Sequence, residues 1–201
     1  MVFAHHSVFA CHGFWLPNDG RGSWSTEVWA PHIKPFGPAT TITARRSLAN
    51  NPHDRGARQA AKDALIYPAV TLNEQHRACV ARGFETIVPI LQLVVYACAI
   101  MPDHVHLVTK RHLKHIEDIV GLLKRAATRQ LTVEGLHPLS GFINRSNRVP
   151  SPWVDGGWNR FIDDHRQIEP AADYVERNPP RIGLPRQSWP FTSPIPVVLS
   201  R

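Results

Sequence analysis

The chain contains 201 residues, of which 43% are hydrophobic and 19% are charged. These proportions are typical of one globular domain with a full core, and they exclude disordered and fibrous proteins. Lysine and arginine number 23 against 16 aspartate and glutamate residues, which gives a formal net charge of +7. Because the arginine guanidinium binds phosphate well, this excess favours nucleic acid as a partner, although surplus charge also serves solubility.

The cysteines and the apolar segments indicate in which compartment the protein works and whether it crosses a membrane. Cys11, Cys79 and Cys98 are too far apart in the sequence to indicate a disulfide framework or a C-x-x-C zinc site. The longest apolar run, Leu93 to Met101, has the length of a strand and is too short to cross a membrane. The first residues also lack the basic start of a signal peptide. We therefore expect a soluble cytoplasmic protein without a membrane partner.

The chain begins with a predicted strand at residues 2–10, followed by a turn-rich loop at residues 13–24. Trp24 in this loop follows Arg21 closely, and exposed aromatic and basic side chains of this kind can stack on unpaired bases. The tryptophan could instead anchor the loop to the core.

Residues 30–56 are rich in proline and basic residues and are expected to be irregular. Short helices are predicted at residues 56–65 and 72–84. We interpret residues 30–68 as an insertion within a single domain that spans residues 1–201.

Two adjacent strands are predicted on either side of Pro102. Residues 91–100 are apolar and rich in β-formers, and residues 104–110 alternate between polar and apolar. Proline cannot donate to a strand ladder, so Pro102 marks the turn between them. In the segment MPDHVHLV, His104 and His106 would then project to one face of the second strand. Two such nitrogens form a potential metal site, but the same pattern also describes any half-exposed strand.

The next element is a predicted helix at residues 114–131, whose apolar positions form one stripe. Three cations lie off this stripe: Lys124, Arg125 and Arg129. They could contact a phosphate backbone, or they could form an ordinary solvated helix face. A loop is expected at residues 135–157, and a further strand at residues 158–162.

A last helix is predicted at residues 168–178, and Pro179 and Pro180 are expected to end it. Tyr174 and Asn178 are four residues apart and share a face of this helix. A phenol is a weak nucleophile at neutral pH, but a divalent cation that polarises a phosphodiester makes its attack on phosphorus feasible. Two histidines and a carboxamide oxygen suit Mg²⁺ or Mn²⁺, with positions left for water and phosphate. Asn178 could equally be only a helix cap, and Tyr174 an ordinary surface residue.

Two motifs together resemble a known family. The segment MPDHVHLV is followed about seventy residues later by YVERNPPRIGLP, which begins at Tyr174. In this order they resemble the histidine–hydrophobe–histidine (HUH) single-tyrosine transposases, and specifically their REP-associated branch of bacterial proteins. The segments GFWLPNDGRGSW and LLKRAATRQL are also similar to members of that branch, so the resemblance covers most of residues 7–190.

The resemblance implies a ferredoxin-like α+β fold, with helices on one side of an antiparallel sheet, the histidine motif on a strand and the tyrosine on a late helix. Tyr174 would be the nucleophile, and His104, His106 and Asn178 would hold Mg²⁺ or Mn²⁺. The family cleaves single-stranded DNA near hairpins through a covalent 5′-phosphotyrosine, and the free 3′-hydroxyl can reverse the reaction for strand transfer. A homodimer is expected, since in the family two copies hold two DNA ends.

Four positions depart from the family pattern. Pro170 within the tyrosine helix and Pro180 after Asn178 are local variations, which bear on the geometry of that helix and on the reach of Tyr174. Asp103 stands where relatives often have Asn or Glu, and we expect it to matter little because strand alternation turns it away from the metal. Asn178 stands where the best-known insertion-sequence relatives have Gln. The other histidines considered are interpreted as surface or core-rim residues, namely His5, His6, His12, His112, His115 and His165.

These features predict a metal-dependent transposase that cleaves and rejoins single-stranded DNA at hairpins or inverted repeats. One alternative is a hairpin-binding protein whose site no longer turns over. Another is a metal-dependent phosphodiesterase that activates water instead of the tyrosine. The residues expected to contact DNA are Arg21, Trp24, Lys124, Arg125 and Arg129.

Overall fold

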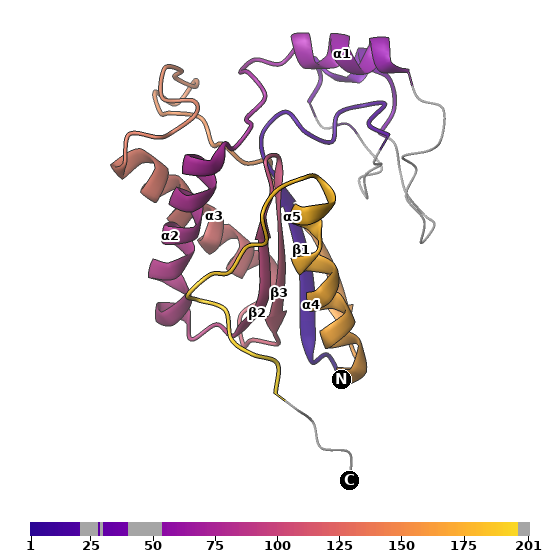
Figure 1. Ribbon diagram of the computed structural model, residues 1–201. Helices are drawn as coiled ribbons and strands as arrows, with labels where there is room; N and C mark the ends of the chain where they lie inside the picture. Colours follow the sequence, from indigo (N-terminus) through magenta and orange to yellow (C-terminus); the bar gives the residue numbers. More distant parts are fainter. Residues whose placement is uncertain (21–27, 29, 40–53, 197–201) are drawn as a thin grey trace.

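The computed structural model describes residues 1–20, 28, 30–39 and 54–196. A four-stranded antiparallel sheet lies between helices (Figure 1), which confirms the predicted α+β class. Along the chain the elements are β1 (Ala4–Ala10), η1 (Lys34–Phe36), α1 (Arg55–Asp63), α2 (Glu74–Leu91), β2 (Val95–Ile100), β3 (His104–Lys110), α3 (Ile116–Val133), β4 (Trp158–Ile162), η2 (His165–Gln167), α4 (Ile168–Glu176) and α5 (Asn178–Arg181).

The sheet has the strand order β2-β3-β1-β4, and every neighbouring pair is antiparallel. Together with α2 and α3, this order gives the βαββαβ arrangement of a ferredoxin-like fold. The turn predicted at Pro102 joins β2 to β3, and the backbone N–H of Met101 donates to the carbonyl of His104 at 2.8 Å. β1 is an inner strand, and its register places Val8 opposite His106 and Ala10 opposite His104.

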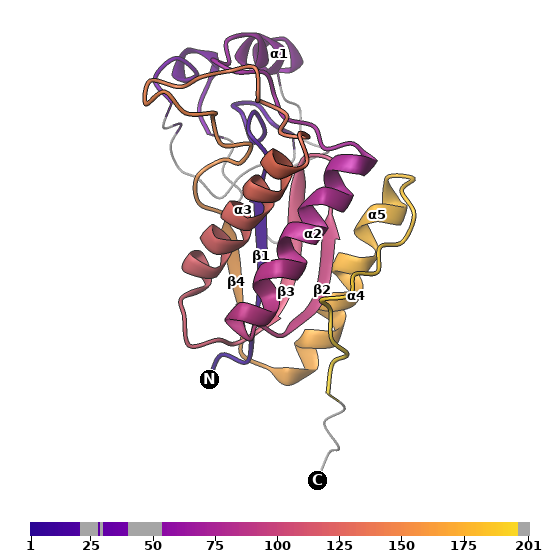
Figure 2. The same ribbon diagram turned by 90° about the vertical axis from the view of Figure 1, so that its left-hand side faces the viewer.

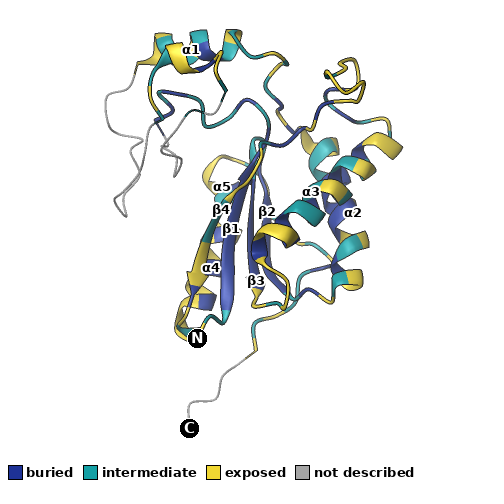
Figure 3. Ribbon diagram, turned by 180° about the vertical axis from the view of Figure 1, so that it is seen from behind, coloured by how far each residue is buried: buried dark blue, intermediate teal, exposed yellow. Residues whose placement is uncertain are grey.

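Helices cover both faces of the sheet (Figure 2). α2 and α3 pack on one face over a core that includes Phe9, Leu107 and Leu123. α4 packs on the other face through Ala172 and Val175. The prediction of helices on one side therefore holds for α2 and α3 but not for α4. The physical reason is that the inner strands are buried on both faces, so each face needs a cover (Figure 3).

α2 and α3, which cover the same face of the sheet, cross at a very short distance. A Cβ atom added at Gly83 of α2 would lie 2.8 Å from the Cα of Ala127 in α3. Real Cβ atoms do not come this close to a backbone, so the absence of a side chain at Gly83 permits the crossing. α2 is longer than predicted and runs to Leu91, with Pro89 in its last turn.

The C-terminal segment covers the outer edge of β2. The Gln187 side chain accepts from the backbone N–H of Ile100 at 2.7 Å and donates to the Ile100 carbonyl at 2.8 Å. Trp189 Nε1 donates to the carbonyl of Cys98 at 3.2 Å, and the Ser193 N–H donates to that of Val95 at 2.7 Å. These bonds satisfy backbone groups that an open sheet edge would leave free.

The last helix region differs from the prediction at its end. α4 stops at Glu176, and the short helix α5 follows at once, with its prolines in its first turn. Proline is tolerated there because the first N–H groups of a helix have no helical acceptor. The two prolines thus end α4 without ending helical structure.

α1 lies with residues 11–20 and 30–39 beyond the end of the sheet where β1 finishes (Figure 1). Asp54 caps α1 by accepting from the backbone N–H of Ala57 at 2.8 Å. The interpretation of residues 30–68 as an insertion stays a prediction. In the ranges that the structure describes, no helix is both long and apolar enough to cross a membrane.

Candidate functional site

The candidate site lies on the α4 face of the sheet, at the start of β3. His104 and His106 both point to this face, and their Nε2 atoms are 2.9 Å apart. The His104 side chain is 20% exposed, whereas His106 as a whole is only 7% exposed. The predicted same-face placement of the two histidines is confirmed, and the pair is open to solvent on the His104 side.

Asp103 orients the first histidine. Its Oδ1 lies 2.5 Å from His104 Nδ1, so the carboxylate accepts the Nδ1 proton. The expectation that Asp103 faces away is therefore wrong. Strand alternation does not apply to Asp103, because β3 begins only at His104 and Asp103 still belongs to the turn. The contact directs His104 Nε2 toward His106.

His6 on β1 is a site residue that the sequence interpretation missed. Its Nε2 lies 3.1 Å from His106 Nδ1, and the residue is only 6% exposed. Burial, and secondarily the charge of Arg160, lowers the pKa of His6 to about 4. Burial also lowers the pKa of His106 well below its usual value. The charges of His104 and His6 are smaller causes that act in the same direction. Both imidazoles are neutral at pH 7, as a metal ligand requires.

Tyr174 lies beside these histidines. Its ring centroid is 5.8 Å from that of His106 and 5.9 Å from that of His6, with both pairs edge to face. Tyr174 as a whole is 43% exposed, and the guanidinium carbon of Arg181 lies 5.3 Å from its ring centroid. Val175, the next residue, is fully buried against the sheet, so Tyr174 sits at the rim of the packed face of α4. The sheet and the last helix thus bring together residues far apart in the chain.

Asn178 is engaged with the helix that precedes it. Its Nδ2 donates to the backbone carbonyl of Tyr174 at 3.0 Å, in the manner of a helix cap. The structure therefore shows the capping interaction, and the role of Asn178 as a metal ligand stays a prediction.

The histidine pair fits a divalent cation. Two nitrogens that bind one cation at about 2.1 Å and at a right angle to each other lie about 3 Å apart. The two Nε2 atoms of the pair meet this spacing at 2.9 Å. In the described part of the chain no three His, Cys, Asp or Glu side chains converge as ligands. Further ligands would therefore be amide or phosphate oxygens or water.

The three cations of α3 lie on the helix that covers the opposite face. Lys124 donates to the carbonyl of Val154 at 2.8 Å and to that of Gly156, and its ammonium lies 5.4 Å from the Phe9 ring centroid. Burial lowers the pKa of Lys124 to about 8, although the negative charge of Asp155 acts to raise it. Arg125 and Arg129 are exposed. DNA contact by these three residues stays a prediction, and Arg21 and Trp24 lie outside the described residues.

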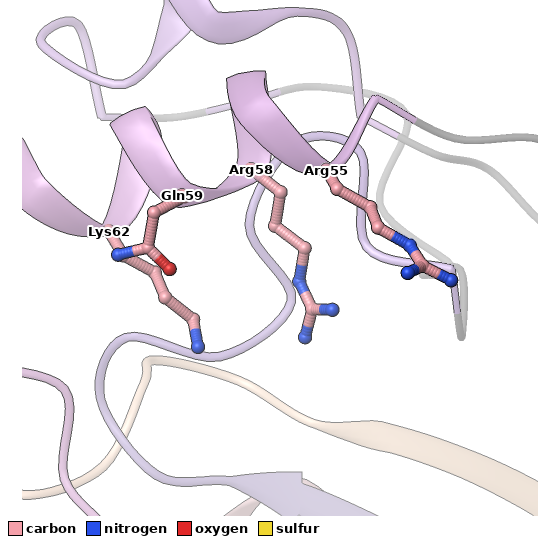
Figure 4. Close-up of a pocket in the computed structure, with 4 residues that line it drawn as sticks. All are labelled: Arg55, Arg58, Gln59 and Lys62. Atoms are coloured by element: carbon pink, nitrogen blue, oxygen red, sulfur yellow. The ribbon is translucent and has the colours of Figure 1, made fainter.

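A second group of cations lines a hollow under α1 (Figure 4). The lining residues of this hollow, which we call the α1 hollow, are Arg55, Arg58, Gln59 and Lys62. The hollow measures about 380 Å³, and Arg58 is held by an ion pair with Asp19 at 3.4 Å. The sequence interpretation did not select these residues, although their spacing along α1 places them on one face of the helix. The hollow beside that face is a feature of the fold that the spacing does not reveal.

No family model matches the sequence, and no curated protein matches it. Two solved structures are similar to the chain. A REP-associated tyrosine transposase bound to a REP hairpin has a TM-score of 0.48 and 11% identity, over 94% of this chain and 74% of that chain. A Deinococcus radiodurans R1 protein, provisionally assigned as a transposase, has a TM-score of 0.44 and 15% identity, over 88% of this chain and 91% of that chain. At these identities the function rests on the geometry of the site itself.

Proposed function

We propose that this protein is a metal-dependent transposase that cleaves and rejoins single-stranded DNA at hairpin or inverted-repeat sites, with Tyr174 as the nucleophile. One observation carries the proposal: the Tyr174 ring on α4 lies 5.8 Å from the His106 ring on β3. A tyrosine with only a structural role has no need of a histidine pair beside it. A phenol beside two histidines that could hold a divalent cation is suited to phosphotyrosine chemistry.

The reaction these residues support is a transesterification. Tyr174 Oη would attack a phosphorus atom of the DNA, the bond to the 3′-oxygen would break, and the phenol proton would end on that oxygen. The products are a 5′-phosphotyrosine and a 3′-hydroxyl. One phosphodiester replaces another, so the reverse reaction can join a strand without an external energy source.

The side chains around Tyr174 have separate tasks in this proposal. His104 and His106 would hold the divalent cation, which when bound polarises the phosphodiester. Arg181 covers the Tyr174 ring at 5.3 Å and restrains its orientation. The net charge of +7 would draw the DNA toward the protein.

The test is adduct formation on labelled single-stranded hairpins taken from inverted repeats that flank the gene, with Mn²⁺ or Mg²⁺ present. We expect a protein–DNA adduct that survives denaturing electrophoresis and that disappears in Tyr174→Phe. Tyr67→Phe is the matched control, because Tyr67 packs near His12 and Phe142, away from the histidine pair. It should form the adduct at the normal rate.

The other outcomes separate the alternative functions. An adduct that persists in Tyr174→Phe would remove the tyrosine from the mechanism. Hairpin binding without cleavage under any divalent metal would indicate a binding protein. Free 5′-phosphate ends with no protein attached, and unchanged by Tyr174→Phe, would indicate a phosphodiesterase that uses water.

A further inference from the structure

Four polar side chains of the candidate site form one continuous line of contacts. Asp103 Oδ1 is 2.5 Å from His104 Nδ1, and His104 Nε2 is 2.9 Å from His106 Nε2. The line continues from His106 Nδ1 to His6 Nε2 at 3.1 Å. We call these four residues the histidine line. It connects the turn before β3 with the inner strand β1.

Counting protons along the histidine line assigns the tautomers in the absence of a cation. The Asp103 carboxylate can only accept, so His104 carries a proton on Nδ1, and in the neutral form of this imidazole Nε2 has a lone pair. His106 then donates from Nε2 to His104. Its Nδ1 is left as an acceptor, and His6 donates to it from Nε2. Three protons serve the three contacts.

If His104 and His106 held a cation through their Nε2 atoms, neither Nε2 atom could carry a proton. The proton of His106 would then lie on Nδ1. The atom that faces Nδ1 is His6 Nε2, which must accept instead of donating, with the His6 proton on its own Nδ1. The total of three protons is unchanged, and no side chain has to move.

We propose that His6 is a positioning residue for the metal site, which accepts the Nδ1 proton of His106 when a divalent cation binds. This inference rests on the proposed function and deepens it. Histidine ligands commonly donate their second N–H to a fixed partner, which sets the tautomer and the ring orientation. His6 is well suited to this task, because β1 is an inner strand and the Trp158 ring packs edge to face on His6 at 5.5 Å.

The test measures Mn²⁺ binding to the full chain in the absence of DNA, by the electron paramagnetic resonance signal of free Mn²⁺. We expect His6→Phe to weaken Mn²⁺ binding by about 10- to 100-fold, as is usual for the loss of such a partner. His6→Gln retains an acceptor oxygen and should recover most of the affinity. His5→Phe is the matched control, because His5 is similarly buried on the same strand but packs against Phe161.

A second readout follows the tautomers directly. Nitrogen-15 spectra of the histidine rings, recorded with and without Mg²⁺, should show the His6 proton on Nε2 before the addition and on Nδ1 after it. A role of His6 in folding alone would not produce this exchange. Thermal unfolding in EDTA identifies any variant that fails to fold. If His6→Phe fails to fold, the tautomers and the Mn²⁺ affinity are compared between His6→Gln and the wild-type chain.

The outcomes distinguish the inference from the proposed function. Equal Mn²⁺ affinity of the wild-type chain and His6→Phe overturns the inference, while the Tyr174 adduct can still stand. A wild-type chain that binds no Mn²⁺ overturns both the inference and the metal requirement of the proposed reaction. Weaker binding in His6→Phe, recovery in His6→Gln and no change in His5→Phe support it.

Discussion

The Asn178 side chain caps a helix, and it is also the predicted third metal ligand. Its amide nitrogen donates to the carbonyl of Tyr174, which leaves the amide oxygen as the atom that could face a cation. Capping requires the nitrogen and ligation requires the oxygen. The two roles are therefore compatible, and they can be separated by experiment.

We expect Asn178→Ala to lower the free energy of unfolding by about 0.5–1 kcal/mol, because one backbone carbonyl at the end of α4 loses its donor. Urea unfolding without metal measures this change. The Mn²⁺ affinity of the same variant tests whether the amide oxygen of Asn178 binds the cation. If affinity stays at the wild-type value, Asn178 is a cap and the prediction that it is a metal ligand fails.

Single residues also show where sequence patterns stop being informative. Alternation along residues 104–110 was sufficient to place His104 and His106 on one face. It could not select His6, because the adjacent His5 fits the predicted first strand equally well. The contact between His6 and His106 depends on the pairing of two strands a hundred residues apart, which no local pattern records.

At the scale of elements, local chemistry predicted the helices and strands but not the faces that they cover. The predicted strands at residues 104–110, from alternation, and at residues 158–162, after a loop-rich segment, have the bounds of β3 and β4 in the structure. Apolar stripes show that a helix packs on something, but they do not say on which face of a sheet. The position of α4 opposite α2 and α3 therefore required the three-dimensional structure.

The crossing of α2 and α3 makes a prediction about stability. Gly83→Ala would place a Cβ 2.8 Å from the Ala127 backbone, so we expect a loss of about 1–3 kcal/mol from forced separation of the helices. Gly121→Ala on α3 is the control, since the nearest atom to its Cβ is the end of the Arg125 side chain at 3.6 Å. That change should be neutral or slightly stabilising. Thermal unfolding compares the two, and equal stability would contradict the close crossing.

The two cationic helices can be distinguished by salt dependence. α1 overhangs the end of the sheet where β3 begins, whereas α3 lies on the face away from Tyr174 (Figure 2). We therefore expect the double variant Arg55→Ala/Lys62→Ala to reduce single-strand affinity and its dependence on salt. The slope of log K against log salt is negative, and each lost phosphate contact makes it less steep by about 0.7. The comparison is Arg125→Ala/Arg129→Ala, and a larger effect there would place the DNA on α3 instead.

At the scale of the whole molecule, the C-terminal segment is part of the fold. It satisfies backbone groups of β2, and Phe191 in it is 8% exposed and belongs to the core beside α2 and α3. We expect a chain that ends at Pro185 to lose at least about 3 kcal/mol, the usual effect of removing one large buried side chain.

The matched control is a chain that ends at Pro196, which keeps every one of these contacts. Thermal unfolding and size-exclusion chromatography compare the two chains. The shorter one should unfold at lower temperature and should also aggregate, because it exposes a strand edge. Identical unfolding of both chains would show that the segment is dispensable.

The inner position of β1 has a consequence for the order of events during synthesis. β1 is synthesised before β3 and β4, so Val8 can pair with His106 and Trp158 only after those two strands have been made. Tyr174 arrives later still. A nascent or prematurely terminated chain therefore has the strand with His6 but neither the paired nitrogens nor the nucleophile. The cutting chemistry we propose becomes possible only after Tyr174 has been synthesised, so a chain that terminates before Tyr174 could not cut single-stranded DNA.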